Sequence, residues 1–150
     1  MNLTEPITWR ADWAWGLPLI LLTVATHVYG LGLVNQAVVR ILNASAERRR
    51  FGTWLAAVMG AVALLVTCLH ALEGVTWAAA YRLLGAVPDA KTAMLYSLNA
   101  MTSYGHENIN LVDRWQLMGA LEALNGWILF GLSTAFLFRI IHRIWPLVGE

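Results

Sequence analysis

Charged residues are scarce in this chain of 150 residues. They make up 13% of the sequence, about half of what a soluble domain carries, and hydrophobic residues make up 59%. The net charge of +1 excludes a general electrostatic attraction to nucleic acid. The single cysteine, Cys68, lies in an apolar run and cannot form a disulfide within the chain. This composition is typical of a protein whose surface faces lipid.

Three apolar segments are long enough to cross a bilayer. They cover residues 17–42, 52–72 and 116–141, and the second is expected to stop at the charged Glu73. About 20 helical residues span a hydrocarbon layer of ~30 Å. The sequence therefore predicts an all-α membrane protein that forms a single membrane domain over residues 1–150, with three transmembrane helices and the lipid bilayer as its surroundings.

Arginines predict the orientation of these helices. Arg48, Arg49 and Arg50 lie between the first two segments, and Arg139 and Arg143 follow the third. By the positive-inside rule these regions are cytoplasmic. We therefore expect the N-terminus outside and the C-terminus in the cytoplasm, in a bacterial inner membrane.

The outer connection between the second and third segments is longer than a simple tie between adjacent helices. Residues 75–86 favour a separate interfacial helix, with Trp77, Tyr81 and Arg82 on its polar and aromatic side. Trp115 is likewise expected at the outer membrane interface. Pro88 breaks the interfacial helix, and a new short helix begins near residue 90, capped by the residue before it, Asp89, or by Thr92.

This short helix and the polar stretch after it predict a re-entrant segment over residues 90–108. The helix is about half as long as the membrane is thick. The polar residues 102–108 must then return as non-helical backbone, which is tolerated at membrane depth only where protein buries it or water reaches it. Several copies around an axis provide such shelter, so the segment predicts an oligomer with an ion path.

The segment Ser97-Leu98-Asn99-Ala100-Met101-Thr102-Ser103-Tyr104-Gly105-His106-Glu107-Asn108 resembles the pore helix and selectivity filter of tetrameric potassium channels. In that family the filter reads Thr-Thr-Val-Gly-Tyr-Gly-Asp. The stretch Gly126-Trp127-Ile128-Leu129-Phe130-Gly131-Leu132-Ser133-Thr134-Ala135 is similar to the family's glycine-bearing inner helix. The resemblance implies a homotetrameric cation channel, with segment 52–72 as the outer helix and no counterpart of segment 17–42 in the minimal subunit.

The filter departs from the family's pattern at several positions. Thr102 and Gly105 match, whereas Glu107 replaces the second glycine. A fourfold ring of glutamates attracts cations and concentrates divalent ones, and the neighbouring His106 titrates near neutral pH. The alternative to such a ring is that Glu107 and His106 pair with each other in a solvated outer vestibule. The resemblance implies a permeant monovalent cation, K⁺, with a divalent cation as the alternative. The candidate filter residues are Thr102, Ser103, Tyr104, Gly105, His106, Glu107 and Asn108.

Three polar or flexible positions of the third segment have alternative interpretations. Glu122 braces the filter from behind, lines the vestibule, or snorkels to water at the interface. Gly126 and Gly131 permit bending of the helix for gating, as the resemblance implies, or only close packing. The candidate residues of a pore-lining helix are Glu122, Gly126, Phe130, Gly131 and Thr134.

His27 and His70 support a second hypothesis. They lie at comparable depths on neighbouring segments, and two such histidines can hold a haem or a metal. Hydrogen bonding between helices is the more common role of a membrane histidine. A third hypothesis is a non-conducting scaffold or accessory subunit. No nucleophile–base pair, zinc-ligand spacing or phosphate loop is present in the sequence, so we expect neither an enzyme nor a resident cofactor.

Overall fold

The computed structural model describes residues 5–43, 51–105 and 109–144. Within this part the chain is helical and has no strand. Three of the helices are long and apolar enough to cross a membrane, which confirms the predicted all-α class and the three apolar spans. The elements are α1 (Glu5–Asn43), α2 (Phe51–Leu83), α3 (Ala90–Thr102), a 3₁₀ turn η1 (Asp113–Trp115) and α4 (Gln116–Ile144).

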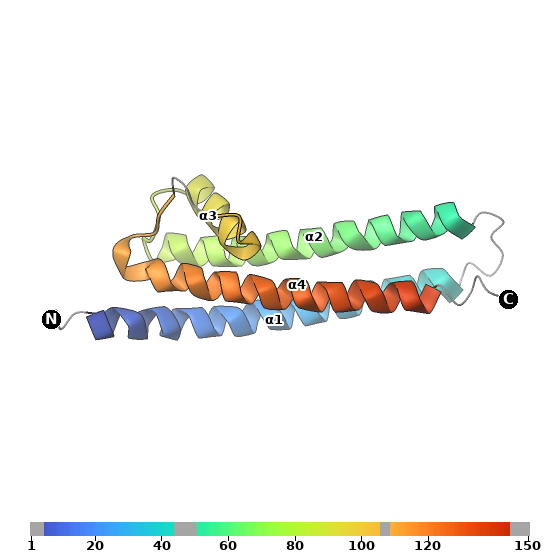
Figure 1. Cartoon of the computed structure of the whole chain (residues 1–150), viewed down its shortest axis with the longest axis horizontal. Helices are drawn as coiled ribbons and strands as arrows, with labels where there is room; N and C mark the ends of the chain where they lie inside the picture. Colours follow the sequence, from blue (N-terminus) through green and yellow to red (C-terminus); the bar gives the residue numbers. More distant parts are fainter. Residues whose placement is uncertain (1–4, 44–50, 106–108, 145–150) are drawn as a thin grey trace.

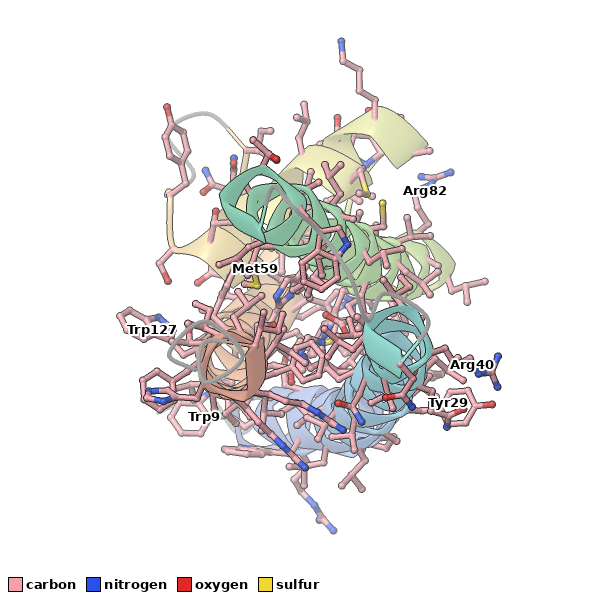
Figure 2. All side chains as sticks on the ribbon, turned by 90° about the vertical axis from the view of Figure 1, so that its right-hand side faces the viewer. Trp9, Tyr29, Arg40, Met59, Arg82 and Trp127 are labelled. Carbon is pink, nitrogen blue, oxygen red and sulfur yellow. The ribbon has the colours of Figure 1, made fainter. Side chains whose placement is uncertain are left out.

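The three long helices lie side by side, and α3 packs against α2 and α4 at the end of the bundle where the N-terminus lies (Figure 1). α1 packs against α2 and α4 as well. Viewed down the bundle, α3 and α1 lie on opposite sides of it, and Trp9, Tyr29 and Trp127 project outward (Figure 2). The C-terminus lies at the end opposite α3 (Figure 1).

The second apolar segment and the expected interfacial segment form one continuous helix. We predicted separate elements over 52–72 and 75–86, but α2 runs from Phe51 to Leu83. The charge of Glu73 suggested the end of a span, yet its side chain is buried against neighbouring helices and the helix continues. α2 ends where Gly85 adopts a φ of 64° and the Ala86 N–H donates to the Tyr81 carbonyl, a glycine-based helix stop.

The aromatic residues near this end of α2 lie inside the protein. Trp77 and Tyr81 are fully buried, and Trp115 is 7% exposed. They were expected at the membrane interface, but α3 folds back over α2 and covers them. Their rings join Leu121 and Ala93 in one apolar cluster at the α3 end of the bundle. A second cluster at the opposite end includes Val62 and Ile140.

α3 begins at the predicted cap. Asp89 has extended backbone, and its carboxylate accepts hydrogen bonds from the Thr92 backbone N–H at 2.9 Å and the Thr92 hydroxyl at 2.6 Å. This satisfies donors that the first turn of a helix leaves without partners. Of the two predicted caps, Asp89 is the one the structure uses.

Asp89→Ala is expected to fray the first turn of α3, because it removes both acceptors of Thr92. Asp89→Asn keeps an acceptor oxygen and should preserve most of the turn. Hydrogen–deuterium exchange of residues 90–93 measures the effect. Equal exchange in the alanine and asparagine variants would contradict the assigned cap.

The same cap predicts a pH dependence. Hydrogen bonds from the Thr92 hydroxyl and then from its backbone N–H lower the pKa of Asp89 below its ordinary value of 3.8. A lowered carboxyl pKa stabilises the folded state fully above 3.8, and this contribution is lost as the pH falls through the folded-state pKa. The difference in thermal stability between the native chain and Asp89→Asn should therefore shrink below this pH.

Candidate functional site

The C-terminal half of α3 is held deep in the bundle by two glycines. A Cβ on Gly126 of α4 would collide with the backbone of Met101, and one on Gly74 of α2 would touch Leu98 at 3.4 Å. Gly126 lies about ten residues inside α4, which corresponds to ~15 Å along the helix. The C-terminal end of α3 therefore packs against the middle part of α4, well away from the N-terminal end of α4.

The last residue of α3, Thr102, and the three residues after it are exposed in the single chain. Thr102 is still helical, although the sequence predicted non-helical backbone from this residue on. Ser103, Tyr104 and Gly105 follow the helix, and Tyr104 is 85% exposed. Ser103 has a φ of 54° and Gly105 a φ of 103°, so the chain leaves the helix through two left-handed residues. The remaining predicted filter residues, His106, Glu107 and Asn108, lie outside the described residues.

One side-chain contact ties this segment to α4. The indole N–H of Trp127 donates to the Ser103 hydroxyl oxygen over 3.0 Å. Trp127 itself is 70% exposed and projects from α4 (Figure 2). The non-glycine left-handed conformation of Ser103 is therefore accompanied by a specific anchor.

Glu122 is fully buried and joins three helices. Its carboxyl group contacts the Ser97 hydroxyl of α3 at 2.5 Å and accepts from the Tyr81 hydroxyl of α2 at 2.6 Å. Ser97 also lies 2.8 Å from the Gly74 carbonyl, although its hydroxyl carries only one proton. A proton on Glu122 satisfies both contacts of Ser97. Of the alternatives for Glu122, this geometry corresponds to a brace behind α3.

The other candidates on α4 divide into two groups. Gly126 is buried and permits close packing, with backbone of α3 where its side chain would be. Phe130, Gly131 and Thr134 are exposed in the protomer, and a Cβ on Gly131 would meet nothing within 4 Å. Together with Trp127, they lie on the C-terminal side of Gly126, the residue of α4 against which the end of α3 packs.

The structure brings His27 and His70 together. Their ring centroids lie 5.0 Å apart, and the Nε2 atoms of both rings lie 3.0 Å from the Ser133 hydroxyl. Their Nδ1 atoms both lie near the carboxylate of Glu73. The rings are thus side by side with shared partners, whereas two axial haem ligands face each other across a porphyrin. This arrangement does not correspond to bis-histidine haem ligation.

Sequence reasoning missed the partners of these side chains. The sequence predicts the end of a span at Glu73 and places Tyr81 at the membrane interface, and it gives no partner for Ser97 or Ser133. One available signal was the i, i+3 spacing of His70 and Glu73, which puts both on one helix face. The contacts between helices join residues up to 106 positions apart and leave no local pattern.

No family model, curated protein or solved structure matches this chain.

Proposed function

We propose that this protein is the subunit of a homotetrameric cation channel of the potassium-channel type. Thr102 to Glu107 form its filter, and the exposed face of α4 lines its pore. K⁺ is the proposed permeant ion, and the altered filter makes a divalent ion the alternative. The chain is proposed to lie in a bacterial inner membrane with its N-terminus outside.

The placement of α3 carries the proposal. Its last turn packs on Gly126, ~15 Å inside α4, and the polar residues that follow are exposed. Non-helical backbone is energetically unfavourable in contact with lipid. Several copies of the chain around a water-filled axis would remove this contact, because the backbone would then face protein and water. The partly negative C-terminal end of α3 would then face the axis, which favours a cation there.

The backbone after α3 also supports a filter. The φ of 103° at Gly105 is one that glycine adopts with little strain, at the position where the resemblance expects a filter glycine. Ser103 is the left-handed residue at which α3 ends, with its backbone N–H bonded to carbonyls of α3, and its hydroxyl lies beside the Trp127 indole. The ring of Glu107 and the acid response of His106 remain predictions from the sequence.

Cation flux tests the proposal. The purified chain is reconstituted in liposomes, and flux is measured in gradients of K⁺, Na⁺ and Ca²⁺. We expect flux above that of empty vesicles, with K⁺ permeating, and a change in selectivity on Glu107→Gln. Absence of flux in all three gradients would instead favour the non-conducting scaffold.

Trp127→Phe tests the proposed filter more specifically, because it removes the hydrogen-bond donor to Ser103 and keeps an aromatic ring. We expect altered selectivity or a several-fold loss of flux, since a misplaced filter loses ion coordination. Trp15→Phe is the matched control, an exposed tryptophan on α1. Equal effects of the two variants would argue against a filter anchored by Trp127.

A further inference from the structure

A polar cluster lies between the two apolar clusters of the bundle, where α1, α2 and α4 meet. It consists of His27 of α1, His70 and Glu73 of α2, and Ser133 of α4. The side chains of His27 and Glu73 are 0% exposed and that of His70 is 13% exposed. The channel proposal assigns no role to this cluster. Burying a carboxylate among apolar helices is costly unless a cation compensates it.

The contacts determine which nitrogens carry protons. His27 Nδ1 lies 2.7 Å from Glu73 Oε1, so this nitrogen donates. The Nε2 of a neutral His27 is then an acceptor, and it receives the single proton of the Ser133 hydroxyl at 3.0 Å. His70 Nε2, also 3.0 Å from Ser133, must therefore donate. A neutral His70 is left with a lone pair on Nδ1.

That lone pair faces another one. His70 Nδ1 and Glu73 Oε2 lie 3.2 Å apart, yet both atoms are buried without a hydrogen-bond partner. Two electron-pair donors held this close attract a cation. A charged histidine supplies one in the form of an ion pair with Glu73, although the two atoms do not meet the geometry of a hydrogen bond. A metal ion is the alternative, because it lies to one side of the line between the two atoms and binds both.

The spacing suits a small transition-metal ion. Ligand atoms about 2.0–2.1 Å from zinc at tetrahedral angles are about 3.3 Å apart, and the observed separation is 3.2 Å. His27, His70 and Glu73 each offer a ligand atom within 4.8 Å of the others. To ligate the ion, His27 must give up the Nδ1 proton that it donates to Glu73, or the proton that its Nε2 accepts from Ser133. Two imidazoles and one carboxylate suit zinc and the neighbouring first-row divalent ions. The Ser133 hydroxyl or a water molecule would complete the coordination.

The cluster lies close to the surface of the chain on one side. The only partly exposed member is His70, whose ring stacks on Phe130 with centroids 4.4 Å apart. Phe130 is itself 39% exposed on α4. His70 is therefore the member of the cluster nearest to the surface of the chain.

We propose that His27, His70 and Glu73 form a binding site for a divalent transition-metal ion of the zinc class, which ties α1 to α2 within the bundle. The site does not depend on conduction. Metal binding is measured on the purified chain whether or not it transports ions, so the two proposals can fail separately.

The test uses the full chain in detergent, stripped with a chelator and then loaded with Zn²⁺ or Co²⁺. We expect about one metal ion per chain by elemental analysis, a visible Co²⁺ absorption spectrum, and a rise in thermal stability with Zn²⁺. His70→Gln and Glu73→Gln should each lower the affinity at least tenfold. His142→Gln is the control, because this histidine of α4 is exposed and its ring contacts Phe138 at a tilt of 59°, outside the cluster.

Three results would overturn the site. The first is metal content well below one ion per chain after loading, and the second is metal that both cluster variants retain. The third is loss of metal in His142→Gln to the same extent as in the cluster variants. If a cluster variant does not fold, His106→Gln decides, because a site in the cluster keeps its bound Co²⁺ in this variant and a site at the proposed filter loses it.

Discussion

Replacing Gly126 with alanine is expected to abolish cation flux and to destabilise the protein. The added Cβ would collide with the backbone of Met101, which cannot yield in the way that a flexible side chain can. α3 must then move away from α4, and the exposed residues after it move as well. Overpacking of this kind costs about 1–3 kcal/mol in the free energy of unfolding. Thermal unfolding in detergent and liposome flux measure the two effects.

Gly131→Ala provides the matched control. It makes the same chemical change on the same helix, but nothing lies within 4 Å of the added Cβ. We expect unchanged or slightly higher stability, because alanine is the better helix former. If Gly131→Ala destabilises the chain as much as Gly126→Ala, then helix bending rather than close packing explains both glycines.

Replacing Glu122 with alanine is the second change with a large expected effect. It leaves the buried Tyr81 hydroxyl without its acceptor and opens a cavity between α2, α3 and α4. An unsatisfied buried hydroxyl costs about 1–3 kcal/mol, in addition to the lost packing. We expect a lower unfolding temperature and loss of flux, because α3 is no longer held in place.

Glu122→Gln separates a brace from an ion ligand. The glutamine carbonyl can accept from Tyr81 while its amide donates to Ser97, and Ser97 in turn donates to the Gly74 carbonyl. If Glu122 only holds α3 in position, glutamine can replace it, and flux should stay within a few-fold of the native value. Loss of flux in a stably folded Glu122→Gln would show that the carboxylate charge itself is needed.

The sequence was sufficient for features that depend on local composition. Runs of about 20 apolar residues predict spans. Polar residues before a short apolar segment predict a cap at Asp89 or Thr92, of which the structure uses Asp89. The break expected at Glu73 was wrong because a charge ends a span only when it must reach water. Here His27, 46 residues away, supplies its partner.

The candidate site was less accessible to sequence reasoning than the fold. The resemblance pointed to Thr102 and Gly105, and the structure places Thr102 at the end of α3 and Gly105 just beyond it. It could not indicate that Trp127 contacts Ser103, since this contact depends on how α3 packs against α4. Trp77 is a similar case. Its residue type suggested the membrane interface, but the packing of α3 against α2 buries it completely.

The structure of the purified complex in a lipid nanodisc tests the central claim most directly. The account predicts four copies around an axis, with Thr102, Ser103 and Gly105 of every copy facing it and ion density between them. A single protomer with residues 102–105 against lipid, or a complex in which these residues face away from the symmetry axis, would contradict it.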